Sequence, residues 1–181
     1  MKKILIIVGS QREKSFNKIV GNFIGQQLEG KAEVSFLDFS KLPFFNQDKE
    51  FPCPAEVQEV RDTIKEYEAL WIVTPEYNGS IPGVLKNALD WISRPVEKGV
   101  SGPPEFVKGK PVAITSAGSR GGSGVRPQME ALMKKMALRA MDQSLGIELP
   151  KESFATGEFS LSEEQKEGLK EQVEKFIEFI G

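Results

Sequence analysis

Histidine is absent from the 181-residue chain. Its absence excludes catalysis by a Ser-His-Asp or Cys-His arrangement, and it argues against a zinc enzyme, in which imidazole is a common ligand. Acid–base chemistry would have to rely on carboxylates, lysine, tyrosine or a bound cofactor. If the chain is an enzyme, we therefore expect it to depend on a cofactor.

Cysteine, excess charge and long apolar runs are scarce as well. Cys53 is the single cysteine, so no intramolecular disulfide and no CxxC pair can form, as is typical of a reduced cytoplasmic protein. A net charge of −2 argues against nucleic acid as a partner. The apolar run from Ile4 to Val8 is too short for a signal sequence or a membrane span. The sequence predicts a cytoplasmic protein without a membrane or nucleic-acid partner.

Apolar runs alternate with helical patterns along the chain. Strands are expected at residues 3–8, 33–37, 69–74, 111–116 and, more weakly, 144–148. Their continuous Ile- and Val-rich character is typical of parallel strands that are covered on both faces. Helices are expected at residues 16–28, 57–67, 82–92 and 124–139, and from Ser162 onward, where Gln165 completes a capping box. The pattern predicts one α/β domain, residues 1–181, with a doubly wound, five-stranded parallel sheet between two helical layers.

Ligands of such sheets bind beyond the carboxyl ends of the strands, so three loops are of interest. The first is GSQREKSFN, residues 9–17, between the first strand and the first helix. Ser10, Ser15 and Asn17 offer hydrogen bonds, Arg12 offers a charge, and the helix start offers free amides, which together suit a phosphate. The alternative is that Ser15 only caps the helix and Arg12 is solvated. The loop is neither a Walker A sequence nor a GxGxxG fingerprint.

The second loop follows the third strand, within residues 74–95. Tyr77 provides a flat surface with a polar tip, and Asn78 with the turn amides can bond the edge of a planar heterocycle. The helix that begins at Pro82 is apolar on more than one side, which favours cover by a second subunit. The alternative is a helix that is fully buried in a monomer.

The third loop, residues 115–128, is rich in glycine and includes Arg120. Glycines allow a backbone to approach a ligand closely, although a flexible surface loop has the same composition. Taken together, the three loops describe a ligand with a phosphate at one end and a flat ring at the other. FMN has that shape, and a flavin would explain an enzyme without histidine.

Three segments of the chain, GSQREKSFN, PEYNGSIPGVLKNALDWISR and SAGSRGG, resemble the NADPH-dependent FMN reductase family over residues 1 to about 150. The resemblance implies a flavodoxin-like fold and a homodimer, or a tetramer, with the flavin near the interface. It implies that the FMN phosphate is held by Ser10, Arg12, Ser15, Phe16 and Asn17. It implies that the ring and ribityl chain are lined by Pro75, Glu76, Tyr77, Asn78 and Gly79, and from the other side by Ser116, Ala117, Gly118, Arg120 and Gly121.

The activity implied is a two-electron transfer from NADPH or NADH, through flavin N5, to quinones, azo compounds, chromate or free flavin. No side chain then needs to act as a catalytic nucleophile, and no metal is expected. Glu76 is expected to form local hydrogen bonds, and Arg120 to reach an acidic group of the pyridine nucleotide. Two alternatives remain: an electron carrier like flavodoxin without its own NAD(P)H oxidase activity, and a flavin-free nucleotide-binding or signalling domain.

Overall fold

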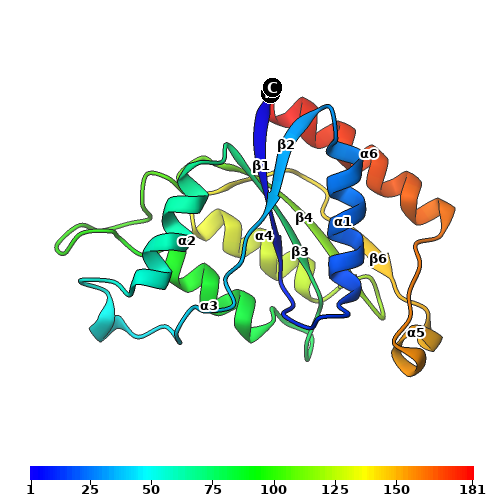
Figure 1. Cartoon of the computed structure of the whole chain (residues 1–181), viewed down its shortest axis with the longest axis horizontal. Helices are drawn as coiled ribbons and strands as arrows, with labels where there is room; N and C mark the ends of the chain where they lie inside the picture. Colours follow the sequence, from blue (N-terminus) through cyan, green and yellow to red (C-terminus); the bar gives the residue numbers. More distant parts are fainter.

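The computed structural model describes all residues 1–181, and its centre is a parallel sheet in the order β2-β1-β3-β4-β5, with β6 also paired to β4. Helices cover both faces of this sheet (Figure 1). The elements are β1 (Lys2–Val8), α1 (Phe16–Leu28), β2 (Ala32–Phe36), α2 (Ala55–Lys65), β3 (Ala69–Thr74), α3 (Gly83–Ile92), β4 (Pro111–Gly118), α4 (Val125–Lys135), β5 (Arg139–Ala140), β6 (Leu145–Glu148), α5 (Lys151–Thr156) and α6 (Glu163–Ile180), with a short 3₁₀ turn at Gln47–Lys49. The predicted doubly wound α/β architecture is confirmed.

The sheet is covered on both sides, as the continuous apolar runs predict. In β1, Ile4 and Ile6 point to the layer formed by α1 and α6, whereas Leu5 and Ile7 point to the layer formed by α2, α3 and α4. All four side chains are at most 1% exposed. A strand buried on both faces needs an apolar residue at every position, which explains why β1 shows no polar alternation.

Two segments differ from the sequence prediction. The helix expected at 124–139 ends at Lys135, because Ala137 adopts a left-handed conformation with φ of 60°. The amide of Leu138 then bonds the carbonyl of Met133 at 2.9 Å, which is the Schellman arrangement that usually has a glycine at the position of Ala137. The chain leaves the helix early and adds the two-residue strand β5, so the sheet has one strand more than predicted. The short helix α5 was not predicted either.

A buried polar chain fixes α6 against the sheet. The indole of Trp71 donates to the hydroxyl of Thr115 at 2.9 Å, and this hydroxyl donates to the side chain of Gln172 at 2.7 Å. The amide of Gln172 in turn donates to the carbonyl of Ile114 at 2.9 Å. Every member of this chain has a partner, so it sets the position of α6 without leaving a buried polar group unpaired. The predicted capping box of Ser162 and Gln165 is present at the start of α6.

The apolar helix α3 is covered mainly by the chain itself. Trp91 is fully buried because residues 43–46 lie over it: its indole donates to the carbonyl of Pro43 at 2.8 Å, and the ring of Phe45 packs edge-on at 4.9 Å. Asn87 fastens the same segment by bonding the amide of Phe45 and the carbonyl of Pro43. The apolar character of α3 is thus explained without a second subunit, and the homodimer stays a prediction.

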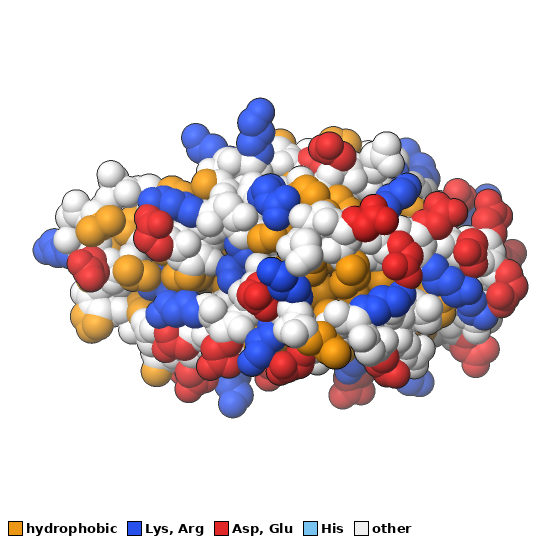
Figure 2. Space-filling model, turned by 90° about the horizontal axis from the view of Figure 1, so that it is seen from above, with side chains coloured by type: hydrophobic (Ala, Val, Ile, Leu, Met, Phe, Trp, Pro, Cys, Tyr) orange, Lys and Arg blue, Asp and Glu red, His pale blue; other side chains and the backbone are white.

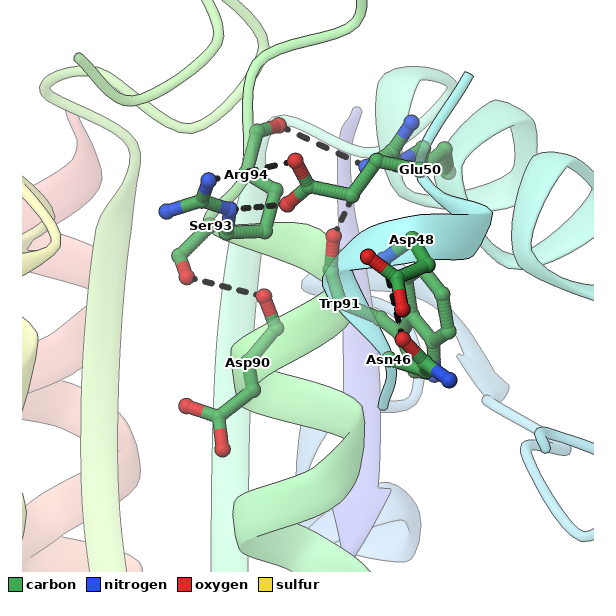
Figure 3. A network of polar contacts seen from close by, with 8 residues as sticks. Asn46, Asp48, Glu50, Asp90, Trp91, Ser93 and Arg94 are labelled. Atoms are coloured by element: carbon green, nitrogen blue, oxygen red, sulfur yellow. Dashed lines mark hydrogen bonds and ion pairs between the residues drawn. The ribbon is translucent and has the colours of Figure 1, made fainter. Parts of the chain in front are cut away.

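An ion pair beside the end of α3 holds the residues that follow the 43–46 segment, up to Glu50 (Figure 3). The carboxylate of Glu50, only 4% exposed, accepts hydrogen bonds from the guanidinium of Arg94. Beside it, the buried Arg61 donates to the carbonyl of Trp91 at 2.9 Å, near the end of the helix, where carbonyl groups lack intrahelical partners. These contacts connect residues 43–50, α2 and the end of α3 into one unit.

The edge of the sheet opposite the carboxyl ends of the strands shows no concentration of one charge. Figure 2 views the molecule from this side, and basic and acidic side chains are interspersed over the whole visible face. Such a surface offers no basic stripe for a phosphate backbone. Among the helices, none combines the length and the apolar composition that a membrane span requires.

We expect Arg94→Met to destabilise the fold, because it leaves the buried carboxylate of Glu50 without its cation. Arg94 itself is partly exposed, so the expected loss is about 2 kcal/mol rather than the full cost of breaking a buried pair. Urea unfolding followed by circular dichroism measures it. The control is Lys108→Met, which breaks the exposed Glu105–Lys108 pair and should cost less than about 1 kcal/mol. Equal losses in the two variants would contradict the structural role of the Glu50–Arg94 pair.

Candidate functional site

A cavity of ≈ 470 Å³ opens at the carboxyl edge of the sheet, which lies at the bottom of Figure 1. Its volume falls within the roughly 300–1,000 Å³ of sites for small molecules and cofactors. It is lined by Ser10, Arg12, Ser15, Phe16, Asn17, Pro75, Glu76, Tyr77, Ala117, Gly118, Ser119, Leu149, Ser153, Phe154 and Gly157. The three loops that the sequence singles out therefore converge on one space, and a fourth segment, after β6, joins them.

Hydrogen-bond donors that suit an anion gather at the start of α1, which we call the anion-binding end of the cavity. Ser15 is the N-cap of the helix, yet its hydroxyl makes no capping hydrogen bond, and the residue is only 3% exposed. The first amides of a helix have no intrahelical acceptor, so a free hydroxyl and free amides lie together here. The guanidinium of Arg12 lies over the ring of Phe16, 4.6 Å from its centroid, and supplies the positive charge.

Close packing behind the first loop requires Gly9. A Cβ at this position would lie 2.8 Å from the hydroxyl of Thr74 and 2.9 Å from the side chain of Leu85. The amide of Gly9 bonds the carbonyl of Val73 at 2.8 Å, so the loop continues the β1–β3 pairing before it turns. The loop after β1 is thus pressed against the end of β3.

Asn17 joins the first loop to the end of β4. Its side-chain amide donates to the carbonyl of Ala117, and its side-chain oxygen accepts from the amide of Ala117, both at 3.1 Å and both buried. The sequence predicts that this side chain bonds a phosphate directly. One N–H and the oxygen of its side chain are engaged with the backbone, so Asn17 positions the first loop relative to β4. The second N–H of the side-chain amide is not used by the chain, and the phosphate contact stays a prediction.

Glu76 joins the loop after β3 to the start of α4. Its carboxylate accepts from the amides of Gly124 and Val125, at 2.7 and 2.9 Å, and lies 3.7 Å from the guanidinium of Arg120. A carboxylate at a helix N-terminus satisfies free amides and complements the helix dipole. The expectation that Glu76 forms local hydrogen bonds is confirmed.

A tight turn presents Tyr77 at the cavity. The amide and carbonyl of Tyr77 pair with those of Ser80, and the two residues between, Asn78 and Gly79, have φ of 52° and 71°. Positive φ at both central positions is the geometry for which Asn-Gly is preferred. Tyr77 lines the cavity and is 49% exposed, so its side chain is accessible to a ligand.

Some predicted residues lie outside the cavity lining. They are Asn78, Gly79, Ser116, Arg120 and Gly121. Ser116 is fully buried behind the loop, where its hydroxyl donates to the carbonyl of Thr74 at 2.7 Å. Gly121 packs so tightly that a Cβ at this position would lie 3.2 Å from the backbone of Gly146. These residues shape the loops, and the part of the glycine-rich loop that reaches the cavity is Ala117, Gly118 and Ser119.

Sequence reasoning missed the wall formed by the segment after β6. Leu149, Ser153, Phe154 and Gly157 line the cavity, although the residues after 148 carry no ligand-binding motif. Pro150 before the short helix and Gly157 after it, with φ of 75°, are the ordinary boundaries of a helix. Pro150 and Gly157 predict a short helix between them, but they do not indicate that this helix lies at the cavity.

A second cavity of ≈ 470 Å³ lies on the other side of the first loop and shares Ser10 and Arg12 with the first. Asp38 belongs to its lining, and hydrogen bonds from the backbone and side chain of Ser40 hold the pKa of its carboxyl below the usual value. No group of histidine, cysteine or acidic residues is arranged to hold a metal ion.

Comparison with known proteins identifies several relatives. The family model for NADPH-dependent FMN reductase matches residues 2–147. A 2-hydroxy-1,4-benzoquinone reductase of Burkholderia sp is 37% identical over 143 residues, which are 78% of this chain and 75% of that protein. A quinone reductase of Pseudomonas putida is 36% identical over 124 residues, 67% of this chain and 63% of the relative, so the match spans less than two thirds of its length.

Solved structures agree with the fold. The flavoenzyme FerB, an NAD(P)H:(acceptor) oxidoreductase of Paracoccus denitrificans, superposes with a TM-score of 0.84 at 28% identity, over 99% of this chain and 97% of that one. A flavodoxin from the domain Archaea superposes with a TM-score of 0.63 at 14% identity, over 98% of each chain, which supports the flavodoxin-like fold alone.

Proposed function

The chain belongs to the NADPH-dependent FMN reductase family, and from this premise we propose that it is an FMN-dependent oxidoreductase that passes two electrons from NAD(P)H to a small-molecule acceptor. Quinones are the acceptor class we favour, because the relatives at 37% and 36% identity are named as quinone reductases. Azo compounds, chromate and free flavin are further acceptors for the same open site.

The observation that carries the proposal is the unpaired hydroxyl of Ser15 beside the free amides of α1 and the charge of Arg12. This donor set suits the phosphate of FMN, whose charge a lone arginine and a helix start can balance. The opposite part of the cavity has the half-exposed ring of Tyr77 and the backbone of Ala117 and Gly118, which suit a planar tricyclic ring.

The residues of this chain bind and orient the cofactor and the substrates. FMN, when bound, supplies the redox chemistry that no side chain here provides. Asn17 and Glu76 hold the surrounding loops in place, so that the donors of the cavity are already positioned before a ligand arrives. We assign no side chain as a nucleophile or a general base.

We also propose a homodimer, with a tetramer as a further assembly, through the side of α3. Val84 of this helix is 38% exposed, and Phe44, on the segment that Asn87 fastens to α3, is 90% exposed. Exposed apolar side chains on this side of the molecule suit an interface between subunits.

Two general features complete the proposal. We propose that residues 1–181 form one flavin-binding domain, because α6 is tied to β4 through Gln172 and the segment before α6 lines the cavity. We propose a cytoplasmic location, since the lone cysteine is typical of a reducing compartment. Cell fractionation with an antibody to the chain tests the location.

We expect Arg12→Ala to weaken FMN binding roughly tenfold or more, because it removes a charge-assisted hydrogen bond of about 1.5–3 kcal/mol. Titration of the apoprotein, followed by quenching of flavin fluorescence, measures the dissociation constant. Lys14→Ala is the matched control: Lys14 is exposed in the same loop but does not line the cavity. If both variants lose affinity equally, net charge alone is responsible and Arg12 is not a phosphate ligand.

The FMN-loaded protein is expected to oxidise NADH or NADPH continuously when benzoquinone is present. The decrease of absorbance of the reduced pyridine nucleotide measures the rate, and the same concentration of free FMN without protein gives the background. An electron carrier like flavodoxin would stay close to this background. That result, in a protein that binds FMN tightly, would replace the proposed enzyme with the carrier.

Sedimentation velocity tests the proposed assembly. We expect the parent protein to sediment as a dimer or tetramer and Phe44→Asp to sediment as a monomer, because a carboxylate cannot be buried at an apolar interface without a partner. Phe36→Asp is the control, since Phe36 is 45% exposed but lies on the edge strand β2. A parent protein that sediments as a monomer at micromolar concentration would contradict the proposal.

A further inference from the structure

The short helix α5 is the part of the cavity wall that neither the motifs nor the family match accounts for. The family model ends at residue 147, whereas the wall contributed by this segment runs from Leu149 to Gly157. In Figure 1, α5 lies at the carboxyl edge of the sheet, on the same side as the start of α1. The chain therefore carries a cavity-lining element beyond the matched region.

Ser153 is the first reason to assign α5 a ligand. Ser153 is 5% exposed and lines the cavity, and its hydroxyl forms no hydrogen bond within the chain. Its backbone groups, by contrast, bond Pro150 and Gly157 at 3.1 and 2.9 Å. This hydroxyl is accessible only from the cavity side of an otherwise buried residue, so it is free to donate to an acceptor on a molecule bound there.

Phe154 is the second reason. Its ring lines the cavity and packs edge-on against Phe16, with the centroids 6.0 Å apart at 86°. Phe16 is the first residue of α1 and lies under the guanidinium of Arg12. Phe154 is still 56% exposed, so its ring stands at the rim of the cavity, next to the anion-binding end.

We propose that α5 retains the cofactor: the hydroxyl of Ser153 donates a hydrogen bond to the phosphate end of FMN, and the ring of Phe154 covers that end against water. This inference rests on the proposed function, and it goes further by assigning these two residues a role in cofactor exchange. A phosphate enclosed between α1 and α5 leaves slowly, so FMN is a resident prosthetic group and not a passing substrate.

The experiment measures FMN binding and release by fluorescence, with no turnover assay. Ser153→Ala is expected to raise the dissociation constant about tenfold, the loss of one hydrogen bond to a charged group. Phe154→Ala is expected to raise the rate of FMN release about fivefold to tenfold, because the cover is gone, whereas Phe154→Leu keeps most of it. Thermal unfolding of each apoprotein checks that the variants fold.

Two control variants test the specific contacts. Ser160→Ala removes an exposed hydroxyl from the same segment, outside the cavity. Phe159→Ala removes a ring that also packs edge-on against Phe16, at 5.8 Å, but does not line the cavity. Both controls are expected to bind and release FMN like the parent protein.

The outcomes separate this inference from the proposed function. If the parent protein binds no FMN, the proposed function itself fails. If the parent binds FMN and Ser153→Ala and Phe154→Ala behave like it, the role of α5 is overturned while the function stands. If Phe159→Ala speeds release as much as Phe154→Ala, the effect comes from the packing of Phe16, and the covering role of Phe154 is overturned.

Discussion

A single buried amide, that of Asn17, holds the anion-binding loop and the end of β4 at a fixed separation. It exchanges two hydrogen bonds with the backbone of Ala117, so the start of α1 and the loop after β4 move as one piece. Without it, the amide and carbonyl of Ala117 would be left buried and unpaired, at a cost of about 1–3 kcal/mol each. The relative position of the first loop and the backbone at the end of β4 follows from this contact.

The remaining loops are fastened in the same manner. Glu76 caps α4 from the end of β3, and Asn78 with Gly79 closes the turn that presents Tyr77. These polar groups are satisfied by the chain, whereas the hydroxyls of Ser15 and Ser153, which line the cavity, are not. Only Nε of Arg61 is fully buried without a partner, so these two hydroxyls are accessible from the cavity and free to donate to a ligand there.

Most features that depend on a short stretch of sequence were predicted correctly, whereas features that depend on distant segments were not. All strands except the two-residue β5 were predicted to within two residues at either end, because buried parallel strands need continuous apolar runs. The residues of the first loop and the Pro75–Tyr77 segment were predicted to share one site, and the structure places them in one cavity. The sequence did not show that Ser116 points away from the cavity. Its hydroxyl bonds the carbonyl of Thr74, which lies far away in the sequence.

Two further features required the folded chain. The apolar pattern of α3 favoured cover by a second subunit, with burial inside a monomer as the alternative. Only the structure shows that residues 43–46 cover Trp91, a contact between segments more than forty residues apart, and the subunit contact stays a proposal. The α5 wall was invisible because its residues bear no motif and reach the cavity only through the packing of Phe154 on Phe16. The sequence by itself determined the order of strands and helices, the loops at the carboxyl edge and the kind of ligand they suit, because periodicity, turn residues and the rule for parallel sheets are local. Only the tertiary structure decided which of those side chains are free to bind and which are used to hold the loops, because hydrogen bonds between distant segments compete for the same polar groups.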